Sequence, residues 1–164
     1  MKEEWILTEL HSAAYNCDLD WVKERIEAGD DVDARDSKGF TPLHWCAFRS
    51  MVGGEPREIA ELLIDNGADV NAKTTNRDSY SVLNWAIDAG NTGVVELLIK
   101  KGADVNLVAG DVTPLMRAAS NGNEQIVELL IRYGADIKQK IGNFTALDYA
   151  KHFGQDHLLD LLAH

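Results

Sequence analysis

Four residues in the first third of the chain carry side chains that bind transition metals: His11, Cys17, His44 and Cys46. Structural zinc sites take such ligands from paired motifs, in which two cysteines or two histidines stand a few residues apart. His44 and Cys46 lie two positions apart, and on a helix such residues point to different sides. A zinc site is therefore the weaker interpretation, and metal-dependent sensing or catalysis remains only as an alternative function.

The acidic segment 30–36 has part of the pattern of a calcium-binding loop. Such a loop supplies oxygen ligands at its first, third and fifth positions and a bidentate glutamate at its twelfth. Asp31 and Asp33 fit this pattern, but Arg35 stands at the fifth position and Pro42 at the twelfth. The segment therefore lacks the ligands that calcium requires.

Motifs that would position a nucleophile, a phosphate group or a catalytic zinc ion are also missing from the sequence. It contains no Gly-x-Ser-x-Gly turn, no glycine-rich phosphate loop and no His-Glu-x-x-His pair. We therefore expect no catalytic residue, no cofactor and no bound metal, and the chain is predicted not to be an enzyme.

One short string recurs along almost the whole chain and sets the positions of the residues above. In its fullest form it reads Thr41-Pro-Leu-His-Trp-Cys-Ala47, followed by Asn66-Gly-Ala-Asp-Val-Asn-Ala72. The residues that open its copies are Thr8, Thr41, Ser81, Thr113 and Thr145, and a glycine follows later at Gly29, Gly67, Gly102 and Gly134. The spacing is regular except in the second copy, which carries an insertion near 48–57.

The string Thr-Pro-Leu-His with a later Gly-Ala-Asp-Val-Asn resembles the ankyrin repeat, a unit of roughly 33 residues. The resemblance implies a β-turn and two antiparallel helices in each repeat. The expected fold is an all-α, ankyrin-repeat solenoid of stacked helix-turn-helix units that are joined by β-turn or hairpin fingers. We expect a single domain, 1–164, with caps at both ends and repeats at approximately 8–40, 41–80, 81–112, 113–144 and 145–164.

The opening string has a physical role at the start of each first helix. Thr41 can cap the helix, Pro42 suits its first turn because a missing N–H needs no partner there, and Leu43 enters the core. By the resemblance, His44 and its equivalent His11 hydrogen-bond to the backbone between repeats.

The second helix of each repeat is predicted by apolar residues at helical spacing. In the third repeat these residues are Val94, Val95, Leu97 and Leu98, which should face the neighbouring repeats. Gly102 follows this helix and is expected to take a positive φ angle, which closes the helix before the next finger.

The balance of charges restricts the partners of the chain. It contains 16 Lys and Arg against 27 Asp and Glu, a formal net charge of −11 at pH 7. This charge repels nucleic-acid phosphates and anionic lipids, so we expect no nucleic acid and no membrane as a partner. The sequence has no apolar run of ~18 residues and no signal-peptide core at its start. We therefore expect a cytoplasmic protein with two free thiols and, as its partner, another protein that is basic.

Ankyrin repeats generally bind proteins along a concave face formed by the fingers and the first helices. The residue before each opener is expected on a finger, and the fifth residue of each string on the first helix. These positions give Phe40, Tyr80, Val112 and Phe144 in one row, and Trp45, Trp85, Arg117 and Tyr149 in another. Exposed aromatic and arginine side chains tend to anchor interfaces. The alternative that Trp45 and Trp85 mainly pack against adjoining repeats stays open.

Two irregular segments add residues to this expected surface. Phe48, Arg49 and Met51 belong to the insertion of the second repeat, and Arg77 lies in the lengthened finger that follows. We expect the interface to centre on repeats two to four, where these irregular segments lie.

Three acidic residues, Asp36, Asp88 and Asp111, lie at or near the same expected surface. Their charges would attract a basic partner and speed its association.

These observations predict a non-enzymatic protein-protein interaction module. Within that class we favour a small stand-alone inhibitor, immunity-type protein or adaptor, which binds its partner as a monomer through the concave face. The alternative of another class is a structural protein that assembles with itself through the row Phe40, Tyr80, Val112 and Phe144.

Overall fold

The computed structural model describes residues 8–48, 56–76 and 79–163. Helices come in pairs along the chain: α1 (Glu9–Asn16) with α2 (Leu19–Glu27), α3 (Pro42–Phe48) with α4 (Pro56–Asp65), α5 (Val82–Asp88) with α6 (Thr92–Lys100), and α7 (Pro114–Asn121) with α8 (Glu124–Arg132). The last unit contains α9 (Ala146–His152), a short 3-10 helix (Asp156–Leu158) and α10 (Leu159–Leu162). This arrangement is the all-α solenoid that the repeats predict.

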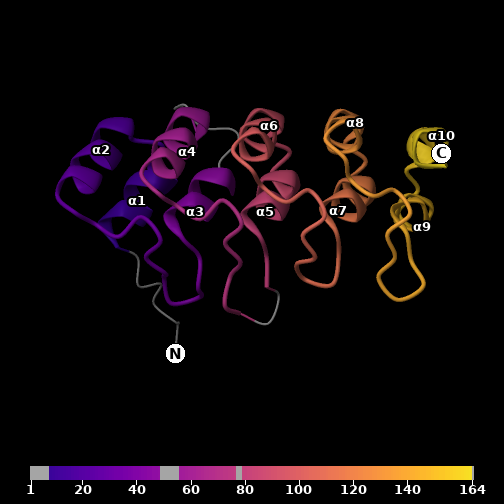
Figure 1. Ribbon diagram of the computed structural model, residues 1–164, viewed down its shortest axis with the longest axis horizontal. Helices are drawn as coiled ribbons and strands as arrows, with labels where there is room; N and C mark the ends of the chain where they lie inside the picture. Colours follow the sequence, from indigo (N-terminus) through magenta and orange to yellow (C-terminus); the bar gives the residue numbers. More distant parts are fainter. Residues whose placement is uncertain (1–7, 49–55, 77–78, 164) are drawn as a thin grey trace.

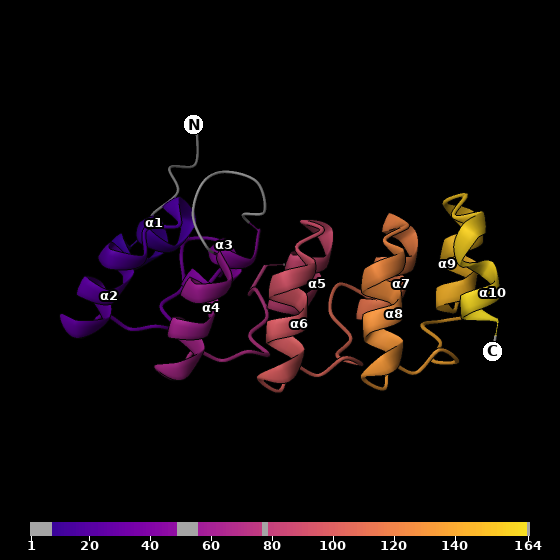
Figure 2. The same cartoon turned by 90° about the horizontal axis from the view of Figure 1, so that it is seen from above.

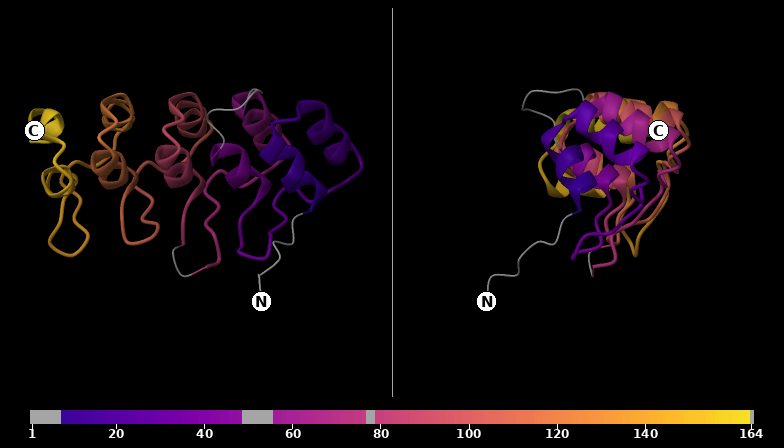
Figure 3. Two further views of the ribbon diagram at one scale, coloured as in Figure 1. Left: turned by 180° about the vertical axis from the view of Figure 1, so that it is seen from behind. Right: turned by 90° about the vertical axis from the view of Figure 1, so that its left-hand side faces the viewer.

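The helices form two layers (Figure 1). We call α1, α3, α5, α7 and α9 the inner row, and α2, α4, α6, α8 and α10 the outer row. Successive pairs stack side by side along the long axis of the molecule (Figure 2). The loops between pairs extend from the inner row as fingers, all toward the same side of the helices (Figure 3).

The core lies between neighbouring repeats, as the helical spacing predicts. Val94, Val95, Leu97 and Leu98 are buried, and in α8 the residues that match them are buried as well. Because each helix pair exposes its apolar face only to the pairs beside it, stability in such a stack comes from the contacts between neighbours.

Polar residues at the openers start the inner helices. Thr8, Ser81, Thr113 and Thr145 each accept a hydrogen bond from the backbone N–H three residues later. This bond satisfies one of the donors that the first turn of a helix leaves unpaired. The prolines also behave as predicted, because α3 begins at Pro42 and α7 at Pro114.

Gly102 ends the outer helix of the third repeat. Its φ angle is +97°, in a region that L side chains rarely adopt. The next residue, Ala103, donates its backbone N–H to the carbonyl of Leu98 at 2.9 Å, which closes the helix end. The prediction of a positive φ at Gly102 is confirmed.

The fourth residue of the opening string ties each of the first three repeats to the next finger. His11 Nε2 lies 3.0 Å from the Phe40 carbonyl oxygen, and His44 Nε2 lies 3.3 Å from that of Tyr80. In the third repeat Asn84 Nδ2 takes the same role and donates to the carbonyl of Ala109 at 3.2 Å. The predicted backbone role of the two histidines is therefore confirmed.

The fingers contact each other through short polar bonds. Each bond joins a backbone N–H to a side-chain oxygen of the finger before it: Asp69 to Asp33, Asp104 to Asn71, and Asp136 to Asn106. Within fingers, isolated antiparallel bridges pair Lys73 with Ser81, Ala109 with Val112, and Ile141 with Phe144. These bonds hold the fingers in a regular row beside the inner helices.

No helix in the described part of the chain has both the length and the apolar character needed to cross a bilayer.

Candidate protein-binding surface

Two members of the expected finger row are not exposed. Phe40 is 5 % exposed and Val112 is 8 % exposed. Phe40 packs against Trp45 and Trp85, whose ring centroids lie 5.7 and 5.0 Å from its own, so the inner helices α3 and α5 cover it. Val112 belongs to the core. The predicted exposure of both residues is wrong, whereas Tyr80 is partly exposed and Phe144 is 60 % exposed.

Aromatic side chains meet on the inner row between repeats one and three. We define the aromatic cluster as Tyr15, Phe40, Trp45, Phe48, Tyr80 and Trp85. Trp85 lies at its centre, with its ring centroid 5.0 Å from those of Phe40 and Phe48 and 5.3 Å from that of Tyr80. Tyr15 packs edge-on against Trp45 at 5.5 Å. The structure therefore brings five residues of the expected site together: Phe40, Phe48 and Tyr80 each contact Trp85, and Trp45 contacts Phe40.

The edge of the aromatic cluster reaches solvent. Phe48 is 45 % exposed and Tyr15 is 36 % exposed, while the two tryptophans are half-buried. Tyr15 was not among the predicted site residues. The sequence did indicate Tyr15 as a site residue, because it occupies the same position after its opener, Thr8, as Phe48 occupies after Thr41.

Asp36 holds the finger together and is not an open carboxylate. Its Oδ1 accepts the backbone N–H groups of Lys38 and Phe40, and its Oδ2 accepts the indole N–H of Trp45 at 3.0 Å. Asp36 is buried. The prediction that it presents charge to a partner is therefore wrong, and Trp45 is fixed by this bond.

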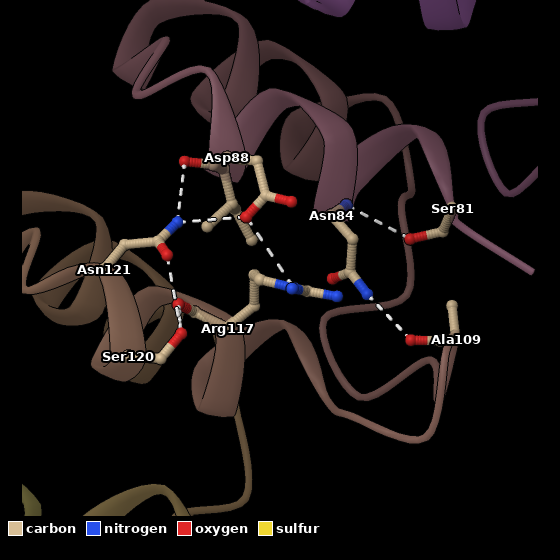
Figure 4. A network of polar contacts seen from close by, with 8 residues as sticks. Ser81, Asn84, Asp88, Ala109, Arg117, Ser120 and Asn121 are labelled. Atoms are coloured by element: carbon tan, nitrogen blue, oxygen red, sulfur yellow. Dashed lines mark hydrogen bonds and ion pairs between the residues drawn. The ribbon is translucent and has the colours of Figure 1, made fainter. Parts of the chain in front are cut away.

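Asp88 and Arg117, both predicted site residues, pair with each other. Arg117 Nε lies 3.6 Å from Asp88 Oδ1, and Asn121 Nδ2 donates to the same oxygen at 3.0 Å. The guanidinium carbon of Arg117 lies 4.9 Å from the centre of the Tyr80 ring. Figure 4 shows Arg117 reaching from α7 toward α5, between Asp88 and Asn84. Repeat four therefore contacts repeat three through the cationic side chain of Arg117.

The remaining predicted residues are Arg49, Met51 and Arg77, which lie outside the described residues. The insertion itself falls between the end of α3 at Phe48 and the start of α4 at Pro56.

Three acidic side chains of the outer row pair with lysine. Lys101 Nζ lies 2.6 Å from an Asp65 oxygen and 3.1 Å from a Glu61 oxygen, and Lys100 Nζ lies 2.6 Å from Glu96. The hydrogen bond and charge of Lys100 lower the pKa of Glu96. These exposed pairs each contribute little stability and keep the outer face charged and hydrated.

The rings of His11 and His44 have no free nitrogen for a metal or for proton transfer. Nδ1 of His44 accepts the backbone N–H of Thr41 at 3.2 Å, so its proton is on Nε2, which donates to the Tyr80 carbonyl. Burial lowers the pKa of His44 to about 4 and also lowers the pKa of His11. Both imidazoles are therefore neutral near pH 7.

The two cysteines are free thiols. Burial raises the pKa of the Cys46 thiol, and its sulfur lies 2.9 Å from the carbonyl oxygen of Pro56. Such a thiol stays protonated and unreactive. Within the described ranges no group of three or more His, Cys, Asp or Glu side chains is placed to hold a metal ion.

A second group of exposed aromatic residues lies on the last repeat. Phe144 is 60 % exposed and Phe153 is 54 % exposed, and with Tyr149 they line a pocket together with Asp148 and His152. Phe153 was not predicted as a site residue, because it follows α9 at a position that the repeat pattern does not mark.

The stacked helix pairs, the row of fingers and the inner surface of aromatic residues define a repeat protein of the class that binds other proteins. The model for ankyrin repeats (3 copies) matches residues 10–109 and 107–164. The chain belongs to the ankyrin repeat family.

Curated relatives share these repeats at moderate identity. A putative ankyrin repeat protein of Rickettsia bellii is 32% identical over 90 residues, which are 54% of this chain and 46% of that protein. Protein phosphatase 1 regulatory subunit 27 of Homo sapiens is 37% identical over 91 residues, 56% of this chain and 54% of that protein. Palmitoyltransferase AKR1 of Saccharomyces cerevisiae is 38% identical over 76 residues, 46% of this chain but 9% of that protein. The chain spans about half or less of these relatives.

Proposed function

We propose that this chain is a non-enzymatic inhibitor or adaptor that binds a basic protein through the exposed edge of its aromatic cluster. The observation that carries the proposal is the position of Phe48. Its ring is 45 % exposed while it packs against Trp85 at 5.0 Å. An aromatic side chain that is held in place yet open to solvent loses little conformational freedom on binding, which is typical of interface anchors.

The surroundings of Phe48 favour a partner over simple packing. Tyr15, Phe48 and Tyr80 leave aromatic surface open along the inner row, and the pair of Asp88 and Arg117 borders it. A partner covering this patch would remove apolar surface from water at its centre and leave the charged pair at its rim.

A basic partner follows from the charge of the whole chain. The formal net charge of the chain is −11. Because Asp36 and Asp88 already bind groups within the chain, we expect the charge of the whole chain, acting at long range, to attract a basic partner. We expect it to raise the association rate and to weaken as salt screens the charges.

The proposal includes a monomeric protein in the cytoplasm, where its two thiols stay reduced. The inhibitor or adaptor role gains support from one relative, because the human protein is named a regulatory subunit of protein phosphatase 1. An immunity-type protein that protects its source from a basic toxin would use the same surface.

Capture of partners from the source lysate tests the proposal. Phe48→Ala removes the exposed anchor, and Tyr133→Ala removes a 40 % exposed aromatic residue at the end of α8 on the outer row, which makes it a matched control. We expect the wild-type chain and Tyr133→Ala to retain the same protein at low salt, and Phe48→Ala to lose it. Equal capture by all three folded proteins would refute the assignment to the aromatic cluster.

Self-assembly is the competing function, and the exposed rings of the last repeat favour it. Sedimentation over a range of concentrations separates the two functions. A monomer at micromolar concentration removes self-assembly, whereas a concentration-dependent dimer that dissociates in Phe144→Ala would support it.

A further inference from the structure

The last repeat contains a pocket that is open and largely aromatic. Phe144, Asp148, Tyr149, His152 and Phe153 line about 280 Å³ of space. Tyr149 has its ring centroid 6.4 Å from that of Phe144 and 6.4 Å from that of Phe153. We call this site the terminal pocket.

Side chains similar to those of the terminal pocket occupy the equivalent positions two repeats earlier. Counted from the openers Thr145 and Ser81, the residues that line the terminal pocket occupy the positions of Tyr80, Asn84, Trp85, Asp88 and Ala89. We call these residues the internal pocket. Both pockets therefore have an aromatic finger residue, an aromatic residue at the fifth position of the string, and a polar side chain between them.

The internal pocket is filled by an arginine. The guanidinium carbon of Arg117 lies 4.9 Å from the centre of the Tyr80 ring, and its Nε lies 3.6 Å from Asp88. In Figure 4 the guanidinium lies beside the side chain of Asn84. The molecule thus shows which group fits a pocket of this shape: a planar cation that stacks on an aromatic ring and faces a carboxylate.

The terminal pocket has the same chemistry in another arrangement. Its carboxylate comes from Asp148, at the position of Asn84. Asp148 Oδ2 accepts from the hydroxyl of Thr145 at 2.7 Å and from its backbone N–H at 2.8 Å, whereas Oδ1 has no hydrogen bond within the described residues. These two bonds from Thr145, and less strongly the charges of Lys151 and Lys140, lower the pKa of Asp148. The pocket therefore combines an ionised carboxylate with three aromatic rings.

We propose that the terminal pocket binds an arginine side chain of a partner protein, in the way that the internal pocket binds Arg117. The site lies on the last repeat and not on the aromatic cluster, so it is separate from the surface that we assign to the main interface. A guanidinium would stack on Tyr149 or Phe144 and pair with the open oxygen of Asp148. The acidic charge of the chain favours such a cationic group over a neutral one.

Titration with a blocked arginine tests this site without knowledge of the partner. We would follow the aromatic signals of Phe144, Tyr149 and Phe153 by NMR while adding Nα-acetyl-arginine amide. The citrulline analogue, which has the same shape without the charge, is the control. We expect saturable shifts that are confined to the terminal pocket, with citrulline binding at least about fivefold more weakly, because the cation–π and ionic contacts are lost.

Two variants locate the binding. Phe144→Ala should weaken arginine binding at least about threefold, whereas Tyr133→Ala on the outer row should leave it unchanged. Both positions are exposed, and an unchanged backbone spectrum verifies that each variant is folded.

Three results would overturn the proposal. The first is that no NMR signal shifts in a saturable way, and the second is that arginine and citrulline bind with equal affinity. The third is that the NMR signals of the pocket rings shift when only the protein concentration changes. The last result would show that a second copy of the chain occupies the pocket.

Discussion

The guanidinium of Arg117 closes over the ring of Tyr80 at 4.9 Å and so joins the fourth repeat to the finger before α5. The same guanidinium pairs with Asp88 at the end of α5. A residue expected to bind a partner therefore stabilises the contact between two repeats, and this role can be measured.

A double-mutant cycle with Arg117→Ala and Tyr80→Ala measures the stacking. We expect the two changes to be non-additive by about 1 kcal/mol in the free energy of unfolding, since each removes the same cation–π contact. Urea denaturation of the four proteins gives the value. Arg117→Ala combined with Tyr133→Ala, which shares no such contact, should be additive. Additivity in the first cycle would show that the stacking contributes nothing.

Stability should fall in mild acid because of His44. Its pKa is about 4 in the folded chain, below the ordinary value of 6.5, so the unfolded chain binds a proton more readily between these values. The stabilisation that comes from keeping His44 neutral is fully present above pH 6.5 and is lost as the pH falls toward 4. At pH 5 the loss amounts to about 2 kcal/mol.

His44→Asn is the control for this pH effect, because Asn84 occupies the equivalent position in the next repeat and makes the equivalent bond. Urea unfolding at pH 7 and pH 5 should show a smaller loss of stability for the variant than for the wild-type chain. Equal losses would mean that other groups cause the pH dependence.

Two glycines with similar backbone angles should differ in their tolerance of alanine. Gly67 has a φ angle of +98° and open space where a Cβ would stand, so Gly67→Ala should cost about 1 to 2 kcal/mol through backbone strain alone. Gly39 has a φ angle of +81°, and a Cβ there would overlap Thr75 of the next finger. Gly39→Ala should therefore cost about 1 to 3 kcal/mol more. Similar thermal unfolding of the two variants would contradict the close approach of the fingers.

Cys17 occupies a position that favours glycine. It ends α1 with a φ angle of +55°, and the equivalent Gly122 ends α7 at +72°. Cys17→Gly should raise the free energy of unfolding by about 1 kcal/mol, because glycine adopts the left-handed region without strain. Cys17→Ala, which keeps the Cβ, should give no such gain. A rise in both variants would point to loss of the thiol and not to relief of strain.

The fold followed from the sequence because its signals are local. A threonine or serine opener, a proline in the first turn and a glycine after the outer helix each act on their own segment. Four openers cap their helices, Pro42 begins α3 and Gly102 has a positive φ angle. The histidine contacts were predictable as well, since His11 and His44 bond to a carbonyl of the adjoining finger.

The candidate site was less predictable because exposure depends on the neighbouring repeat. The position before an opener places Phe40 and Phe144 alike on a finger, yet Trp85 of α5 covers Phe40 while Phe144 stays 60 % exposed. The pairing of Asp88 with Arg117 depends in the same way on how two helices lie side by side. Spacing along the chain does not specify these distances.

The aromatic cluster on the inner row is the interface that we assign to the partner. The most direct test is hydrogen exchange of the chain with and without the partner that it captures. We predict slower exchange in α3, α5 and the fingers beside Phe48 and Tyr80, with α6 and α8 unchanged. Protection confined to α6 and α8 would place the interface on the outer row and contradict the account.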